Sequence, residues 1–282
     1  MLLHKYTGIA GKDIVFNARL KVSDPNSFND PFELALNVLK INPAAVKKYL
    51  LKNKPVVRQY FDRGITTGRI KESWKGFRKR ISDPTTRDNM ARDISSGLNG
   101  DFKGIFNQRD GSVTAFFMLC CFCGPPLRDM DEVLMWAHYS EGLRGLRFSM
   151  ESELLNKKPI EVEKVRYQEK IVTMDPVGLL TRDREGIRES LGISLGTKSK
   201  AWEYEQEWRW FVDKRICKED EKSKEWFVPI DLKAIKRIDF GEKCRQSSID
   251  EISAQISTLK LEIELKKAIP SAIDFKLNYI DL

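Results

Sequence analysis

Acidic and basic side chains alternate with aromatic ones at 202–209, where the chain reads Trp-Glu-Tyr-Glu-Gln-Glu-Trp-Arg. If 202–212 forms a β-strand, alternate side chains share a face. The aromatic side chains would then occupy one face, and the other face would carry Glu203, Glu205, Glu207 and Arg209. Carboxylates that lie close together raise one another's pKa, and such a row suits a ligand hydroxyl, a cation or a developing positive charge. The alternative is an antiparallel strand with one solvated face.

A histidine and a tyrosine close the segment Met-Trp-Ala-His-Tyr at 135–139. Asp129 and Glu132 have the spacing of a capping box, which predicts a helix from there through Trp136 to about residue 140. His138 could act as a general base, a ligand donor or a nucleotide contact, with Tyr139 beside it. The alternative is a hydrogen-bonded structural histidine, since a lone histidine on a helix is more often structural than catalytic.

The segment Asn-Asp-Pro-Phe-Glu at 29–33 has the chemistry of a helix start, with a capping residue followed by proline. Its polar side chains could equally line the rim of a pocket, namely Asn29, Asp30 and Glu33. Near the N-terminus, the predicted strand 2–6 would present His4 and Tyr6 on one face.

Basic residues gather around a predicted helix at 70–81, with Trp74 and Phe77 between them. The cations that could contact nucleic-acid phosphates are Arg69, Lys71, Lys75, Arg78 and Arg80. The alternative, which we favour, is a solvated helix face above two core aromatic side chains.

The pattern of the remaining elements mixes strands and helices without a βαβ rhythm. Strands are predicted at 13–20, 112–122, 146–150, 162–167, 226–230 and 235–240, and helices at 175–196 and 248–256. We therefore expect an α+β fold with a mixed, mostly antiparallel central sheet. Residues 1–282 are expected to form a single domain, interrupted by a helical, basic insertion at 42–110.

Composition narrows the class of protein. No stretch of 18 apolar residues occurs and the N-terminus lacks the features of a signal peptide, so we expect a cytoplasmic protein with no membrane partner. With five cysteines and two histidines, the chain offers too few suitably spaced ligands, and no metal is predicted. The net charge of +8 permits a nucleotide or a nucleic acid as partner. Motifs of P-loop, Rossmann, zincin and α/β-hydrolase proteins are absent.

Taken in order, these short segments resemble a known bacterial family, the domain of unknown function twenty-nine seventy-one. The resemblance rests on Lys5-Tyr6, 29–33, 135–139, a Lys-x-x-x-Trp spacing that leads into 202–209, and Phe240-Gly241. It spans residues 1 to about 245. Members are similar to accessory genes of defence or toxin loci, so the resemblance implies an anti-phage or toxin setting, with a protein from the same locus as a further partner.

The layout is also similar to that of ADP-ribosyltransferases, which place an early His or Arg, then a Tyr or Ser, then a late-strand Glu. That similarity would make NAD the substrate, Glu205, Glu207 and His138 the catalytic candidates, and His4 and Tyr139 pocket residues. A late-strand carboxylate could stabilise oxocarbenium character as nicotinamide leaves. The alternatives are a nucleic-acid-binding or nuclease effector, and a non-enzymatic sensor or partner-binding module.

Overall fold

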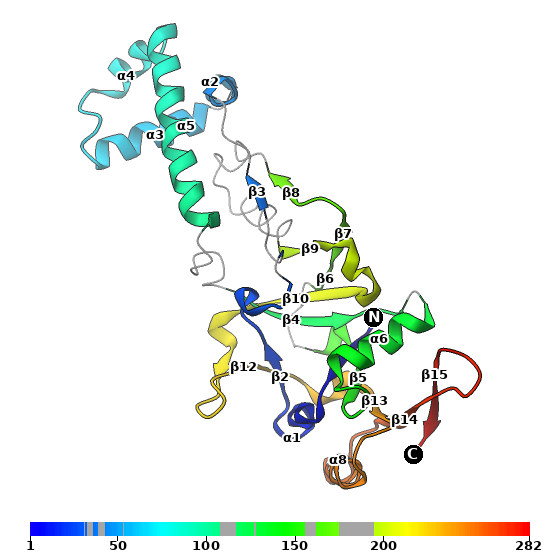
Figure 1. Ribbon diagram of the computed structural model, residues 1–282. Coiled ribbons are helices and arrows are strands. Elements are labelled where there is room, and N and C mark those ends of the chain that lie inside the picture. The colour runs from blue at the N-terminus through cyan, green and yellow to red at the C-terminus, as the bar shows by residue number, and fades with distance from the viewer. Residues whose placement is uncertain are drawn as a thin grey trace. The chain divides into compact units, whose positions relative to one another are not determined.

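The computed structural model describes residues 1–30, 32, 36–38, 43–52, 54–107, 117–126, 128–155, 162–174 and 195–282 (Figure 1). The chain divides into two compact units. Unit 1 comprises residues 1–33, 114–170 and 196–282, and unit 2 comprises 34–113 and 171–195. The α+β class expected from the sequence is confirmed, since a large mixed sheet and several helices coexist.

Unit 1 is built on an eight-stranded sheet with the order β15-β14-β13-β5-β1-β4-β10-β6. Its strands are β1 (Leu2–Thr7), β4 (Phe117–Cys123), β5 (Leu146–Glu151), β6 (Val162–Lys164), β10 (Glu207–Asp213), β13 (Ile235–Gly241), β14 (Glu264–Pro270) and β15 (Leu277–Asp281). Neighbours are antiparallel except for β13 and β14, which are parallel. Helix α8 (Gln246–Thr258) provides the crossover that a parallel pair requires.

Smaller elements complete unit 1. A three-stranded sheet joins β11 (Lys218–Glu219), β12 (Trp226–Pro229) and β2 (Arg19–Val22), and a parallel pair joins β7 (Arg166–Gln168) and β9 (Thr197–Ser199). Besides α8, the helices of unit 1 include α1 (Asp13–Asn17), α6 (Asp129–Tyr139) and the 3₁₀ helix η5 (Lys200–Glu205).

Strand alternation gives the large sheet one apolar face and one polar face. Leu3, Phe122, Phe148 and Trp210 belong to the apolar core, into which α1, α8 and the three-stranded sheet also send side chains. The registers place their sequence neighbours on the opposite face, where His4 lies across from Cys123 and Ser149. This polar face carries the functional candidates of the sheet, and α6 packs against it through Trp136, whose ring lies edge-on to Tyr6.

Unit 2 is mainly helical where it is described. Its elements are β3 (Leu36–Val38), α2 (Pro43–Lys52), α3 (Lys54–Thr66), α4 (Trp74–Arg80), α5 (Pro84–Asn107) and β8 (Val172–Met174). The described residues of 42–110 are mostly helical. Phe61, Ile70 and Phe77 form a separate apolar cluster. The predicted helix at 175–196 lies outside the described residues up to 194.

Three predicted strands differ from the structure, and one of them, 162–167, divides into β6 and β7, which belong to different sheets. The segment 13–20 contains α1 before β2, because Asn17 donates to the Asp13 carboxylate one helical turn earlier and Ala18, at φ 49°, then ends the helix. The strand predicted from 202 begins only at Glu207, because Ser199 caps η5 and Gln206 turns the chain at φ 44°. Glu203 therefore does not share a strand face with Glu207 and Arg209.

The cap of α6 also differs by one residue from the prediction. Arg128 is the N-cap, and its backbone N–H donates to the Asp131 carboxylate at 3.1 Å. Asp131 is fully buried and Asp129 is exposed. The helix itself is confirmed.

Candidate functional site

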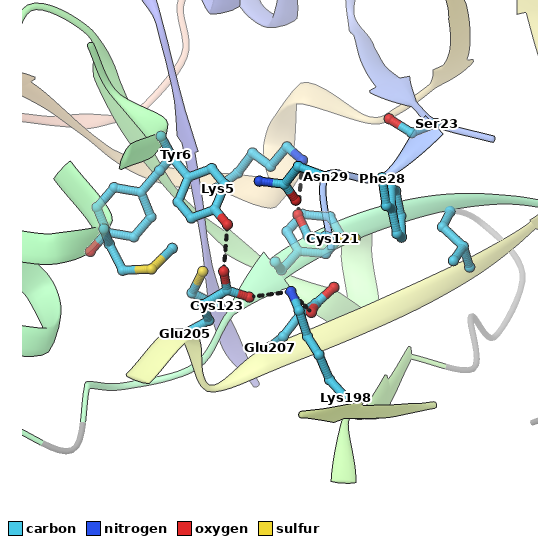
Figure 2. A pocket seen from close by; sticks show the side chains of 14 residues that line it. Lys5, Tyr6, Ser23, Phe28, Asn29, Cys121, Cys123, Lys198, Glu205 and Glu207 are labelled. Carbon is cyan, nitrogen blue, oxygen red and sulfur yellow. Dashed lines mark hydrogen bonds and ion pairs between the residues drawn. The ribbon is translucent and has the colours of Figure 1, made fainter. Parts of the chain in front are cut away.

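A pocket of about 180 Å³ opens in unit 1 where β1 separates from β4 (Figure 2). The two strands are paired at His4 and Cys123, whereas further along β4 the partner of Leu119 is Ser23, which follows β2. Between these two pairings the β4 edge faces the pocket. A cavity of about 150 Å³ holds a benzene ring, so this pocket has room for one sugar or one heteroaromatic ring.

Two glutamates and one lysine form a buried cluster in the pocket wall. Lys198 Nζ lies 2.6 Å from Glu205 Oε2 and 3.0 Å from Glu207 Oε2. Lys198 is on β9, Glu205 ends η5 and Glu207 begins β10, so the left-handed turn at Gln206 brings both carboxylates to one ammonium group. All three side chains are buried.

The surroundings of the two carboxyl groups shift their pKa values in opposite directions. Burial raises the pKa of Glu205, and the attraction of Lys198 offsets this only in part. Glu207 is buried as well, but Arg209 and Lys198 together lower its pKa to about 2. Arg209 holds the Glu207 carboxylate through Nε at 2.9 Å and Nη2 at 3.1 Å. Pairs of carboxyl groups separated in this way can act as an acid/base group and a permanent anion.

Tyr139 completes the cluster from the last turn of α6. Its hydroxyl donates to Glu205 Oε1. Burial and the adjacent Glu205 carboxylate raise the pKa of Tyr139, so the phenol remains a donor at neutral pH. Tyr6 also lines the pocket, and burial raises its pKa. The pocket wall therefore combines aromatic rings with carboxylates.

The structure brings together many of the residues singled out by the sequence. Glu205, Glu207, Tyr6, Tyr139 and Asn29 line the pocket, and Arg209 lies behind Glu207.

Other candidates lie elsewhere or outside the described residues. His138 is exposed on α6, with its ring centroid 6.2 Å from that of Tyr204, and it does not line the pocket. Asp30 is buried and accepts from the Phe32 N–H at 2.9 Å, as in an Asx turn. Glu33 and Pro31 lie outside the described residues, so the helix start predicted there does too.

His4 faces a different group of residues from the one predicted. Its Nδ1 lies 2.9 Å from the Ser149 hydroxyl. Burial, together with the positive charges of Arg147 and Arg237, lowers the pKa of His4 to about 4. His4 and Tyr6 share a strand face as expected, but Tyr6 lines the pocket and His4 does not.

Sequence reasoning missed Lys198, Lys5 and two pocket thiols. Lys198 is the lysine of the Lys-x-x-x-Trp spacing, so a signal was present, although nothing in it indicated contact with both glutamates. Cys121 and Cys123 are on β4, where they lie opposite Arg209 and Glu207 of β10, respectively. Burial is the main cause that raises the pKa of both thiols. The nearby carboxylate of Glu207 raises the pKa of Cys121 further, and that of Glu205 raises the pKa of Cys123. They are therefore protonated lining groups rather than thiolate nucleophiles.

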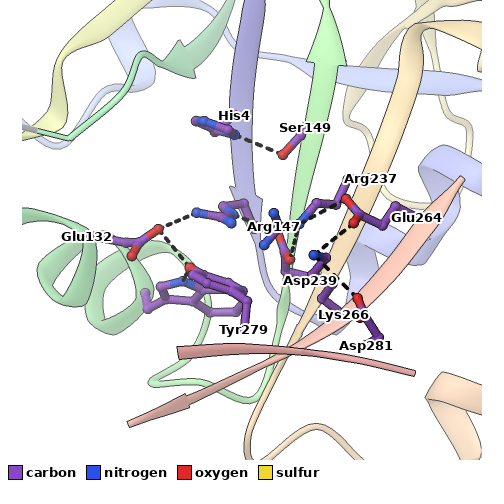
Figure 3. A network of polar contacts seen from close by, with 11 residues as sticks. His4, Glu132, Arg147, Ser149, Arg237, Asp239, Glu264, Lys266, Tyr279 and Asp281 are labelled. Carbon is purple, nitrogen blue, oxygen red and sulfur yellow. Dashed lines mark hydrogen bonds and ion pairs between the residues drawn. The ribbon is translucent and has the colours of Figure 1, made fainter. Parts of the chain in front are cut away.

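A second polar network occupies the same sheet face around Arg147 (Figure 3). Arg147 on β5 donates to the Glu132 carboxylate on α6 and, through Nε at 2.7 Å, to Asp239 on β13. Tyr279 on β15 donates to Glu132 at 2.7 Å, and its ring centroid lies 4.4 Å from the Arg147 guanidinium carbon. Because these charges are paired with one another, the network fixes α6 and β15 on the sheet.

The basic residues of unit 2 surround an aromatic core. Trp74 and Phe77 pack with Phe61, at ring-centroid distances of 5.1 and 5.2 Å. The predicted cations are exposed around them, namely Arg69, Lys71, Lys75, Arg78 and Arg80. Arg80 pairs with Glu72 at 2.6 Å. This arrangement agrees with a solvated face above core aromatic side chains, and the exposed cations also remain accessible to a phosphate backbone.

The described residues contain no group of three or more His, Cys, Asp or Glu side chains placed to hold a metal ion. None of the helices searched is both long and apolar enough to span a bilayer.

Comparisons with known proteins give no relative. No family model matches the chain, and no curated protein or solved structure matches it either. The family resemblance stays a prediction.

Proposed function

We propose that unit 1 is an ADP-ribosyltransferase-like enzyme that breaks the N-glycosidic bond of NAD. The observation that carries this proposal is the pair Glu205 and Glu207, whose pKa values are shifted in opposite directions around one lysine. Paired carboxyl groups whose pKa values are shifted apart are suited to reactions at the anomeric carbon of a sugar. The pocket has room for one ring of the nicotinamide riboside, and the rest of the dinucleotide would extend outward.

In this reaction the bond between ribose C1′ and the nicotinamide nitrogen breaks, and nicotinamide leaves with the bonding electron pair. Glu207, an anion at every physiological pH, stabilises the positive charge that develops on C1′ and the ring oxygen. An acceptor hydroxyl or amine then forms the new bond to C1′. Glu205 in its ionised form takes the acceptor's proton, and Tyr139 and Lys198 hold its carboxylate in place.

This proposal is tested by incubating the protein with NAD labelled in the adenylate half, with and without bacterial extract. Release of nicotinamide and transfer of the label are measured. We expect Glu205→Gln and Glu207→Gln each to lower the rate by about 10²–10⁴-fold, the range for a positioned acid/base group. Glu203→Gln is the matched control, because Glu203 lies on the same 3₁₀ helix and does not line the pocket. If the wild type releases no nicotinamide, the proposal is wrong.

The bacterial defence or toxin setting that the family resemblance implies belongs to the same proposal. The non-enzymatic alternative, a sensor or partner-binding module, predicts a different outcome for the same protein. Glu205→Ala and His138→Ala would then lower the melting temperature while the wild type itself turns over no NAD.

A second candidate function, nucleic-acid binding, is favoured by the exposed cations of unit 2 around α4. Arg69, Lys71, Lys75 and Arg78 are exposed while the aromatic side chains between them are packed. Binding through phosphate contacts weakens steeply with salt, and the salt slope falls by about one for each contact removed. Lys75→Gln and Arg78→Gln should lower that slope, whereas Lys218→Gln, an exposed position in unit 1, should not. Binding that does not change with salt would exclude this function.

A further inference from the structure

Lys5 reaches the pocket of unit 1 through the gap between β1 and β4. Strand alternation places Lys5 on the same side of β1 as the core residue Leu3. Its ammonium group nevertheless donates to the Cys121 carbonyl at 2.8 Å, on the β4 edge between the pairings at Cys123 and Leu119. Among the described residues, no strand is paired with Cys121 on this side of β4, so Lys5 satisfies its backbone acceptor, and Lys5 lines the pocket.

Lys5 and Lys198 differ in their contacts with carboxylates. Lys198 contacts two carboxylates, and Glu207 also contacts Arg209. Within the part of the chain that the structure describes, no carboxylate lies at ion-pair distance from Lys5; its ammonium group donates to the Cys121 carbonyl and lies 5.9 Å from the centroid of the Phe122 ring. An ammonium group has three donor hydrogens, and a partly desolvated cation gains most from an anion.

Neutral donors accompany Lys5 in the lining. Ser23 offers a hydroxyl and Asn29 an amide NH₂ group. In the view of Figure 2, Lys5, Asn29 and Ser23 occupy the upper part of the pocket, and Glu205, Glu207 and Lys198 occupy the lower part. The pocket is therefore polarised, with hydrogen-bond donors and an available positive charge on one side and carboxylates on the other.

We propose that Lys5, assisted by Asn29 and Ser23, binds a phosphate group of the ligand, while the sugar that carries this phosphate faces Glu205 and Glu207. The ligand class is therefore a sugar phosphate or a nucleotide rather than a free nucleoside. The placement of the sugar rests on the proposed function. The placement of the phosphate does not, because it rests on Lys5 and its neighbours Asn29 and Ser23. Lysine binds phosphate as a compact point charge through its three donors.

The test measures binding without turnover, using ribose 5-phosphate and ribose as probes in calorimetric titrations of the full chain. We expect the wild type to bind ribose 5-phosphate more tightly than ribose by about tenfold or more, as for one charge-assisted hydrogen bond. Inorganic phosphate should compete with ribose 5-phosphate. Lys5→Met should bring the two affinities to within about twofold of each other, and Lys5→Arg should keep the preference.

Lys12→Met is the control, because Lys12 is an exposed lysine paired with Glu251 and lies outside the pocket. It should keep the full preference for phosphate. Asn29→Asp provides a second test that does not disturb the Cys121 contact, since Asn29 is exposed. Its added negative charge should weaken binding of ribose 5-phosphate more than binding of ribose and so reduce the preference for phosphate.

The proposal is overturned if the wild type binds neither probe or binds both equally. It is also overturned if the preference persists in folded Lys5→Met or is undiminished in Asn29→Asp. These results differ from a failure of the proposed function, which shows as a lack of nicotinamide release from NAD. A phosphate preference that depends on Lys5, without NAD cleavage, would support the phosphate site and exclude the glycosidic reaction.

Discussion

Replacing Lys198 by methionine should destabilise unit 1 strongly and in a pH-dependent way. The lysine is 9% exposed and contacts two buried carboxylates at 2.6 and 3.0 Å. Removing one partner of a buried ion pair costs about 3–5 kcal/mol, because a charge is left without compensation. Here Glu207 keeps Arg209, so the loss falls mainly on Glu205 and we expect about 3 kcal/mol near pH 8.

The pH dependence follows from the direction of the Glu205 shift. Its pKa is already raised by burial, and loss of Lys198 removes the main attraction that opposes this. A carboxyl group with a raised folded-state pKa favours the folded state at low pH, and this contribution is lost as pH rises through that pKa. The destabilisation by Lys198→Met should therefore be smaller at pH 5.5 than at pH 8, by about 1–2 kcal/mol.

The assay is urea unfolding followed by tryptophan fluorescence at both pH values. Of the six tryptophans, Trp74 alone lies in unit 2, so the signal reports mainly on unit 1. Lys200→Met, an exposed position nearby, is the control and should change stability by less than about 0.5 kcal/mol. A loss below about 1 kcal/mol, or one that is the same at both pH values, would refute the assignment of Lys198 as the shared counter-ion.

Three further changes test the polar face of the sheet. Tyr139→Phe removes a donor that lowers the pKa of Glu205, so the carboxyl pKa measured by NMR should rise; an unchanged or lower value contradicts the contact. Tyr279→Phe removes a hydroxyl bonded to two α6 side chains and should cost about 1–3 kcal/mol in thermal unfolding, whereas a neutral result would show that this bridge does not hold α6. The pKa of His4 is lowered from 6.5 to about 4, so the stability of the wild type should fall by about 3 kcal/mol as pH drops from 6.5 to 4. His4→Asn should reduce this fall. Equal pH profiles of stability for wild type and variant would contradict the prediction.

Local patterns in the sequence were sufficient for most of the elements. The apolar run that ends at Phe122 predicts the central strand β4, and the spacing from Asp129 to Tyr139 predicts α6, because periodicity and capping are properties of neighbouring residues. The same reasoning failed at 202–206. Alternating charged and aromatic residues favour a strand, but the Ser199 cap and the left-handed conformation of Gln206 impose a 3₁₀ helix and a turn there.

The sequence by itself determined that Glu205, Glu207, Arg209 and Tyr139 belong to short segments rich in polar residues in an α+β protein. Only the tertiary structure decided what they contact. Lys198 comes from a different strand to neutralise both glutamates, and Arg209 holds one carboxylate and not the other, so one pKa rises and the other falls. Desolvation and charge pairing depend on neighbours far apart in the chain. Spacing therefore singled out these four residues, and packing decided which groups each of them contacts.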